Sequence, residues 1–261
     1  MSRNALRARL HDGHPAIGGW SVIPDLLAAE TVAWCGFDYV GVDMQHGLAA
    51  YGDLPPMVAG IQLGGATPIV RVPVDDLATV QRALDAGVEG IIVPLCESSA
   101  AAAAAVAACR YAPRGSRSFG PSRSRMYLGS DPATVNDEVL CFVMVETVAG
   151  LQVVDEIAGT ADLDGIYVGP SDLAISLGVE VGSEDPVLTA ALAKILEACR
   201  RHGIVPAIHA PSGTAARSLL EQGFAMVTIS NDAMMLRTAY LRELDAVRNT
   251  IIDRPTRGIY S

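Results

Sequence analysis

The fold is decided by one stretch of the sequence, PIVRVPVDDLATVQRALDAGVEGIIVPLC, which spans residues 68–96. The stretch begins and ends with apolar runs rich in Val and Ile, at residues 68–73 and 90–96. Runs that are continuously apolar, rather than alternating, are typical of strands buried on both faces of a parallel sheet. Between them, residues 75–86 have a helical pattern, with an Asp at its start and Gly87 as its stop. The stretch therefore predicts a strand, a helix and a second, parallel strand.

The same pattern recurs along the rest of the chain. Six more apolar runs occur, at residues 17–23, 37–44, 141–147, 165–169, 205–209 and 224–230. Further helical patterns lie at residues 98–109, 188–202 and 213–222. Eight strands that alternate with helices predict a single α/β domain, residues 1–261, folded as a (β/α)8 TIM barrel. An open doubly wound sheet is the alternative, but the sequence has no G-x-G-x-x-G after the first run and no G-x-x-x-x-G-K-[ST] anywhere.

Composition narrows the class of protein. The chain has 261 residues and a formal net charge of −10, which makes nucleic acid a poor partner because phosphate binding rests on clustered Lys and Arg. No apolar run reaches the roughly 18 residues of a membrane-spanning helix, and residues 1–6 lack the apolar core of a signal peptide. The five cysteines form no C-x-x-C pair, so we expect buried, reduced thiols. We therefore expect a cytoplasmic protein that binds neither nucleic acid nor membrane.

Residues 110–139 form a long segment without clear periodicity. Five arginines precede its first acidic residue, Asp131: Arg110, Arg114, Arg117, Arg123 and Arg125. Long loops in compact domains are usually functional or disordered. We expect this arginine-rich segment to follow the fourth strand and so to lie at the catalytic face, where the chemistry of such barrels gathers. A solvated surface loop is the alternative.

Polar side chains stand at the carboxyl ends of the second and third apolar runs, where a barrel places its chemistry. Asp43 and His46 stand at the carboxyl end of the second run, and a carboxylate near an imidazole can orient the ring as a general base. A structural turn is the alternative for this pair. Arg71 lies inside the third run, where a buried guanidinium requires an anion. It either makes an internal salt bridge to a barrel carboxylate or holds a substrate oxygen.

Two carboxylates end neighbouring strands, because Glu146 ends the fifth run and Asp172 follows the sixth. Side by side, such groups repel each other unless a proton, an arginine or a metal cation lies between them, and their oxygens suit Mg²⁺ or Mn²⁺. His209 ends the seventh run and is interpreted as a pocket-wall or packing residue. Lys194, the only lysine, lies in a helical pattern away from any strand end, which argues against a Schiff-base mechanism.

Three of these stretches resemble the HpcH/HpaI aldolase family of class II pyruvate aldolases, over about residues 37–232. They are FDYVGVD at residues 37–43 leading to His46, VET at residues 145–147, and GIYVGPSDL at residues 165–173. The third is the most specific, and the order and spacing of all three match. The resemblance implies a barrel of the phosphoenolpyruvate/pyruvate type. It also implies reversible aldol cleavage of a 4-hydroxy-2-oxo acid to pyruvate and an aldehyde, through the enolate of pyruvate.

The resemblance assigns roles to individual residues. Glu146 and Asp172 match the family's ligands for a divalent cation, Mg²⁺, Mn²⁺ or Co²⁺. Arg71 matches the arginine that contacts the keto oxygen of pyruvate and stabilises the enolate. His46, oriented by Asp43, matches the histidine that transfers protons. The segment that receives the pyruvate carboxylate matches four residues: Gly169, Pro170, Ser171 and Asp172.

Two residues depart from the family pattern. Gln45 stands where many members have Glu, and Met144 stands where many have Gln. We expect both at the substrate-binding site, where they bear on the choice of aldehyde and on the rates of side reactions. The family is typically a hexamer with helix exchange between subunits. We therefore expect a homo-oligomer in which residues of the arginine-rich segment reach a neighbouring site.

Three alternatives stay open. A CoA-thioester lyase of the citrate-lyase β type shares the barrel and the metal carboxylates, and the arginine-rich segment could supply its basic nucleotide-binding surface. Oxaloacetate decarboxylation passes through the same enolate, so it is expected at least as a side activity. A non-catalytic barrel that binds a metabolite is the third alternative, and the combined presence of the four residues expected to do the chemistry speaks against it.

Overall fold

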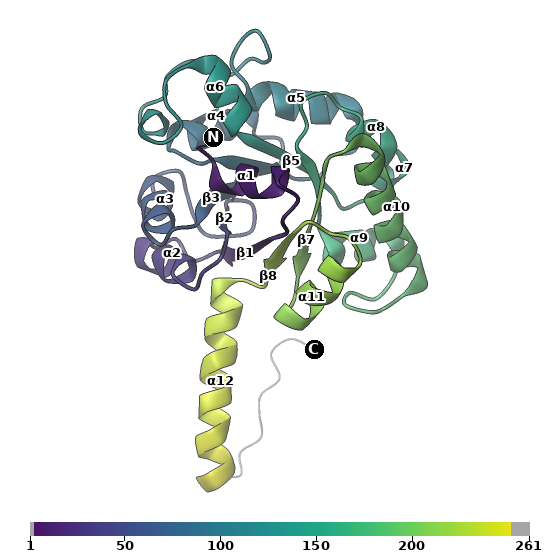
Figure 1. Ribbon diagram of the computed structural model, residues 1–261. Helices are drawn as coiled ribbons and strands as arrows, with labels where there is room; N and C mark the ends of the chain where they lie inside the picture. The colour runs from purple at the N-terminus through teal and green to yellow at the C-terminus, as the bar shows by residue number, and fades with distance from the viewer. Residues whose placement is uncertain (1–2, 252–261) are drawn as a thin grey trace.

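Within residues 3–251, the part of the chain that the computed structural model describes, eight parallel strands close into a barrel (Figure 1). Each strand pairs with the next one along the chain, and β8 pairs back with β1. The strands are β1 (Ala16–Ser21), β2 (Tyr39–Asp43), β3 (Thr67–Arg71), β4 (Gly90–Val93), β5 (Leu140–Val145), β6 (Gly165–Val168), β7 (Val205–Ala210) and β8 (Met226–Ile229). Every apolar run of the sequence overlaps one of them, so the predicted (β/α)8 barrel is confirmed and the open sheet is excluded.

Helices connect the strands on the outside of the barrel (Figure 1). In chain order the helical elements are α1 (Ala5–His11), α2 (Leu26–Ala33), α3 (Leu54–Leu63), α4 (Leu77–Asp85), α5 (Ser99–Cys109), the short 3-10 turn η1 (Ser124–Met126), α6 (Pro132–Glu138), α7 (Val148–Gln152), α8 (Val154–Ala158), α9 (Pro170–Leu177), α10 (Pro186–His202), α11 (Gly213–Glu221) and α12 (Asp232–Ile251). The predicted helices end close to the expected residues. Asp76 caps α4 by accepting a hydrogen bond from the Thr79 amide at 3.0 Å, and Gly203 ends α10 in the left-handed conformation.

Side chains of the strands form two apolar layers. One layer packs between the strands and the surrounding helices and includes Val42, Val70 and Ile91. The other layer fills the inside of the barrel and includes Leu6 of α1. Four of the five cysteines are buried and free, as predicted, but Cys35 is exposed because it follows the surface end of α2.

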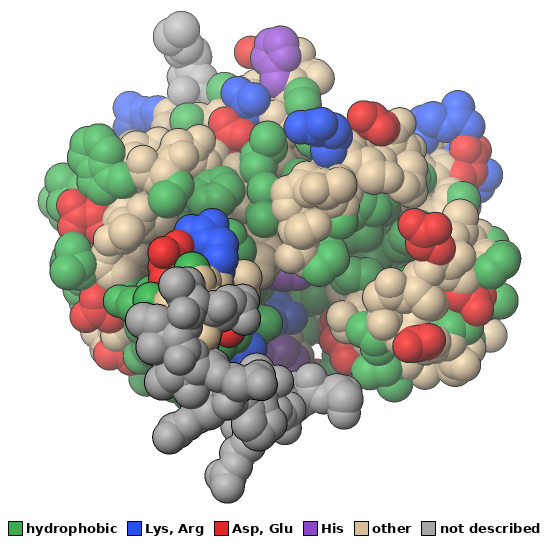
Figure 2. Space-filling model, turned by 90° about the horizontal axis from the view of Figure 1, so that it is seen from below, with side chains coloured by type: hydrophobic (Ala, Val, Ile, Leu, Met, Phe, Trp, Pro, Cys, Tyr) green, Lys and Arg blue, Asp and Glu red, His purple; other side chains and the backbone are tan. Residues whose placement is uncertain are grey.

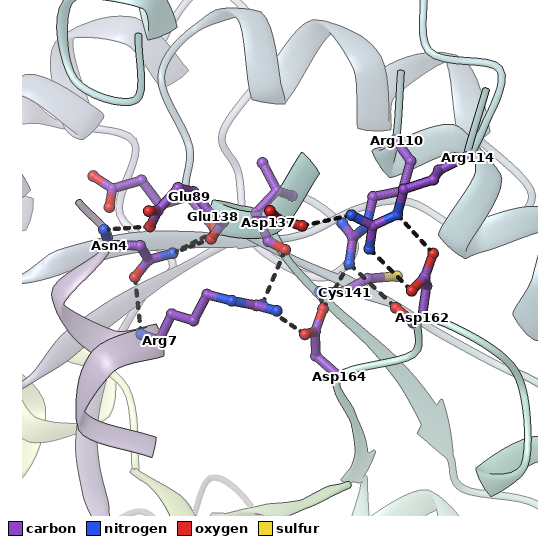
Figure 3. Close-up of polar contacts among 11 residues, drawn as sticks. Asn4, Arg7, Glu89, Arg110, Arg114, Asp137, Glu138, Cys141, Asp162 and Asp164 are labelled. Atoms are coloured by element: carbon purple, nitrogen blue, oxygen red, sulfur yellow. Dashed lines mark hydrogen bonds and ion pairs between the residues drawn. The ribbon is translucent and has the colours of Figure 1, made fainter. Parts of the chain in front are cut away.

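The arginine-rich segment lies at the opposite end of the barrel from the one predicted for it. The prediction was wrong because helix α5, rather than strand β4, precedes the segment, which therefore leads back to the amino ends of the strands. There Arg110, only 1% exposed, pairs with Asp164 at 2.8 Å, and Arg114 pairs with Asp162 and Asp137 (Figure 3). These arginines are thus neither at the catalytic face nor simply solvated.

The last helix, α12, projects from the barrel instead of packing along it (Figure 1). Its first residue, Asp232, accepts hydrogen bonds from the Ser21 hydroxyl and from the amides of Val22 and Ile23, which joins the helix to the end of β1. No helix within residues 3–251 combines the length and the apolar character that crossing a membrane requires.

We predict that Asp164→Ala destabilises the fold far more than Asp137→Ala does. Loss of Asp164 leaves the buried Arg110 without its anion, and an uncompensated buried charge costs about 3 kcal/mol or more. Asp137 is 73% exposed, and the pair that it makes with Arg114 contributes about 1 kcal/mol or less. Urea unfolding of the two variants beside the parent protein measures both losses in free energy. Equal losses would contradict this account of the amino end.

Candidate active site

A cavity of about 470 Å³ opens at the carboxyl ends of the strands, the end from which α12 projects. Figure 2 shows this end of the molecule hollowed, with basic and histidine side chains lying in the hollow. The lining includes eight residues that the sequence places at the site: Asp43, His46, Arg71, Met144, Gly169, Pro170, Ser171 and Asp172. Side chains far apart in the sequence therefore meet in one cavity.

Asp43 and Arg71 form an ion pair in the floor of this cavity. They end β2 and β3, and the register of the two strands places them side by side. Arg71 donates two hydrogen bonds to the Asp43 carboxylate, from Nε at 3.0 Å and from Nη2 at 2.5 Å. The carboxylate also accepts from the amides of Gln45 and His46 and from Nε1 of Trp20. Burial raises the pKa of Asp43, but the Arg71 guanidinium and the two amides outweigh it and hold that pKa below its usual value.

The pairing leaves one edge of the Arg71 guanidinium for the cavity. Nη1 lies 4.0 Å from the sulfur of Met144, and the guanidinium carbon lies 5.3 Å from the centre of the Trp20 ring. The internal salt bridge expected as one alternative for Arg71 is therefore present. It does not exclude the other alternative, because Arg71 also lines the cavity and its Nη1 has only the weak acceptor sulfur of Met144 as a partner.

His46 and Gln45 differ from expectation in their contacts. Asp43 binds the backbone amide of His46 at 3.1 Å, and no hydrogen bond joins it to the His46 ring among the described residues. The carboxylate is already occupied by Arg71, so it does not orient the imidazole. His46 itself is exposed and lines the cavity. Gln45 is not part of the lining, and its side-chain oxygen is buried without a hydrogen-bond partner.

Glu146 is buried just behind the cavity wall, where β5 ends. Its Oε1 accepts a hydrogen bond from the Leu95 amide at 2.9 Å. Leu95 adopts a positive φ of 53°, a conformation that is strained for a leucine and that marks functional loops. The Oε2 atom faces Gly169, at which an added Cβ would lie only 2.4 Å away. Glycine at this position therefore makes room for the carboxylate.

Glu146 and Asp172 lie close enough to affect each other. Burial is the main cause that raises the pKa of Glu146, and the negative charge of Asp172 raises it further. Asp172 stands in the first turn of α9 and is exposed in the cavity. Within residues 3–251 neither carboxylate makes a salt bridge, and no group of three or more His, Cys, Asp and Glu side chains gathers around a point. A cation held here would take two protein carboxylates and complete its shell with substrate or water.

Three residues of the site carry no clear signal in the sequence. Trp20 and Tyr167 lie in apolar runs and look like core, yet both line the cavity because alternate strand residues face the inside of the barrel. Leu95 contributes its backbone amide rather than its side chain. Its φ is positive although the residue is not a glycine, so the sequence does not indicate this conformation. The interpretation of His209 as a pocket-wall residue is confirmed, since it lines the same cavity.

Comparison with known proteins places this site in a family. The model of the HpcH/HpaI aldolase/citrate lyase family matches residues 18–239. The chain belongs to this family. A hydroxypyruvate/pyruvate aldolase of Rhizorhabdus wittichii is 38% identical over 239 residues, which cover 90% of this chain and 95% of that relative.

Other relatives support the same family assignment. A 5-keto-4-deoxy-D-glucarate aldolase of Klebsiella pneumoniae is 31% identical over 248 residues, which cover 94% of this chain and 97% of the relative. A solved HpcH/HpaI family protein from Burkholderia cenocepacia superposes with a TM-score of 0.87 at 33% identity, covering 94% of this chain and 99% of that one. This HpcH/HpaI protein is accordingly a carbon–carbon lyase, and a non-catalytic barrel is excluded.

The structure also removes support from two other mechanisms. Lys194 lies on α10, where its amine donates to the Leu151 carbonyl at 2.8 Å, outside the cavity lining. Because the HpcH/HpaI protein has no other lysine, a Schiff-base mechanism lacks its amine. A CoA pocket built on the arginine-rich segment loses its basis, because Arg110 and Arg117 pair with carboxylates at the amino end of the barrel.

We predict that Arg71→Lys lowers kcat/KM for the aldol reaction by about 100-fold to 1,000-fold. Lysine keeps the charge but lacks the planar fork that binds both oxygens of Asp43 and directs another N–H at the cavity. The control is Arg82→Lys, because Arg82 stacks on Tyr51 at 3.8 Å and does not line the cavity. Initial rates of carbon–carbon cleavage measure both variants. A full rate in Arg71→Lys would remove Arg71 from the reaction.

Proposed function

We propose that this lyase is a class II pyruvate aldolase, which reversibly cleaves a 4-hydroxy-2-oxo acid to pyruvate and an aldehyde. The observation that carries the proposal is the Nη1 edge of Arg71, which is not used by Asp43, contacts only the sulfur of Met144 and lies in a cavity that Asp172 also lines. A fixed donor of this kind stabilises the negative charge that develops on the keto oxygen as the enolate of pyruvate forms. The names of two relatives, both aldolases and one of them a pyruvate aldolase, support the same reaction.

Glu146 and Asp172 would hold a divalent cation, Mg²⁺, Mn²⁺ or Co²⁺. Burial and the neighbouring charge of Asp172 both raise the pKa of Glu146, and a cation between the two carboxylates relieves that repulsion. Gly169 leaves room for Oε2 of Glu146, because an added Cβ would lie only 2.4 Å from that atom. Carboxylate oxygens are the ligands that these ions prefer. When bound, such an ion acts as a Lewis acid on the substrate oxygens.

Two parts of the chain would hold pyruvate itself. Arg71 would donate Nη1–H to the keto oxygen, and the first turn of α9 would receive the carboxylate. Pro170 has no amide hydrogen, so the amides of Ser171 and Asp172 are the donors that open this helix. Pyruvate held at both ends would present its methyl carbon to the rest of the cavity, which is the orientation that carbon–carbon bond formation needs.

His46 would transfer the proton. Asp43 holds its backbone amide and so sets the position of the loop, while the exposed ring is accessible to solvent at the cavity rim. An imidazole in this position can carry a proton, directly or through one water molecule, between solvent and the hydroxyl group of the aldol.

We propose that the protein forms a homo-oligomer, the hexamer typical of the family. Its support is α12, which projects from the barrel and carries a stripe of exposed apolar side chains: Leu236, Tyr240, Leu244 and Val247. Residues spaced by three and four lie on one face of a helix, and an apolar face of this kind packs against another surface. We propose that this surface belongs to another copy of the chain.

We predict that metal-dependent proton exchange at the pyruvate methyl group falls by about 100-fold or more in Glu146→Gln and in Asp172→Asn. Each change removes one carboxylate ligand and leaves the side chain's shape nearly intact. The control is Glu97→Gln, an exposed glutamate after β4 that binds the Thr147 hydroxyl at 2.8 Å. Proton NMR in deuterated water, with chelated protein and with each added ion, measures exchange without an aldehyde. Exchange that persists in both variants would refute the metal assignment.

We predict that the double variant Tyr240→Glu, Leu244→Glu is smaller in solution than the parent protein. Two charges on the apolar stripe of α12 oppose its burial against another copy. Thr238→Glu adds a charge to the same helix away from the stripe and should leave the mass unchanged. Analytical ultracentrifugation measures all three, and an unaltered mass in the double variant would contradict packing through this face.

A further inference from the structure

Part of the cavity wall has no role in the proposed aldol reaction. The residues assigned to that reaction come from the ends of β2, β3, β5 and β6. The remaining wall comes from the ends of β1, β7 and β8 and the start of α12, and we call five of its residues the far wall: Val22, His209, Asn231, Ala233 and Met234. Pyruvate, a three-carbon acid, fills only a fraction of about 470 Å³. The far wall therefore borders the part of the cavity that pyruvate leaves empty.

His209 is one of two polar groups in the far wall. Its ring meets the Trp20 ring edge-on, with centroids 5.7 Å apart and an interplanar angle of 82°. No hydrogen bond involves its ring nitrogens within residues 3–251, so the lining ring keeps both for a ligand. Burial, and then the positive charge of Arg71, lower the pKa of His209 to about 4. The imidazole is therefore neutral near pH 7, with one nitrogen as donor and the other as acceptor.

Asn231 is the other polar group, and its position is fixed from two sides. Its Oδ1 accepts a hydrogen bond from the Met234 amide at 2.9 Å, which leaves the Nδ2 group to donate elsewhere. The next residue, Asp232, binds the amide of Val22 at 2.9 Å and ties the end of β8 to the end of β1. Because β7 and β8 are paired, His209 and Asn231 come from adjacent strand ends.

We propose that His209 and Asn231 select substrates that carry a hydroxyl group on or beside the reacting carbon. The proposal rests on the aldolase function proposed above and names its substrate class. A hydroxyl group can donate to the free imidazole nitrogen and accept from the Asn231 amide, so it satisfies both residues.

Other substituents fit the far wall less well. A carboxylate there gains no salt bridge from the far wall itself, because Val22, Ala233 and Met234 are apolar and His209 is neutral. A plain methyl group leaves two polar side chains without partners in a partly desolvated site, which is unfavourable. The chemistry of the wall therefore favours a neutral group that both donates and accepts.

The hydroxyl group has two possible sources in an aldol reaction. It belongs either to the nucleophile, as in 3-hydroxypyruvate, or to the aldehyde, as in glycolaldehyde. The test compares kcat/KM for matched pairs: 3-hydroxypyruvate against pyruvate with one aldehyde, and glycolaldehyde against acetaldehyde with pyruvate. Each pair yields a preference ratio in which a general loss of activity cancels.

The variants distinguish the effect of hydrogen bonding by His209 and Asn231 on these ratios from the effect of their packing. His209→Phe keeps an aromatic ring against Trp20 but removes both polar nitrogens, and we expect it to lower one preference ratio by about tenfold. His209→Gln restores a donor and an acceptor and should recover most of that ratio. Asn231→Asp keeps the acceptor for the Met234 amide but loses the donor, and should lower the same ratio. His14→Leu, at an exposed histidine outside the cavity, is the control.

A fall in the 3-hydroxypyruvate ratio supports the proposal with the hydroxyl on the nucleophile, and a fall in the glycolaldehyde ratio supports it with the hydroxyl on the aldehyde. Ratios that stay within about twofold of the parent in both His209→Phe and Asn231→Asp overturn the proposal while the aldolase function stands. Absence of any reaction of pyruvate in the parent protein overturns the aldolase function, and this inference with it.

Discussion

The ion pair between Asp43 and Arg71 is the interaction on which the site depends. It uses two donors of the guanidinium and so directs the third toward the cavity. It also occupies the carboxylate, which therefore holds the loop of His46 through a backbone amide and leaves the imidazole ring unattached. Trp20 donates to the same carboxylate, lies beside the guanidinium and meets the ring of His209. One paired charge in the barrel floor thus positions both sides of the cavity.

The two ends of the barrel differ in how their charged side chains are paired. At the amino end, Arg110 and Arg117 are buried and each is neutralised by an aspartate, so this end contributes to stability. At the carboxyl end, Glu146 and Asp172 lie near each other and neither makes a salt bridge within residues 3–251, because the nearby Arg71 is paired with Asp43. Unpaired charge of this kind is costly to the fold and is typical of a site that binds a ligand.

Much of the fold and a large part of the site could be predicted from the sequence, because both rest on local patterns. A continuous apolar run predicts a buried parallel strand wherever it occurs, and eight such runs alternating with helices predict a closed barrel. A polar residue at the end of a run must then lie at the carboxyl face. This reasoning places Asp43, Arg71, Glu146 and Asp172 at one end before any contact is known.

By itself, then, the sequence determined the barrel, the family and the end of the barrel where the polar residues gather. Tertiary structure alone decided which side chains meet: that Asp43 binds Arg71 rather than the ring of His46, that Gln45 stays out of the cavity lining, and that His209 joins the far wall. It also placed the arginine-rich segment at the amino end. The physical reason is that strand periodicity is local, whereas partners are set by register and by closure of the barrel, which join residues distant in sequence.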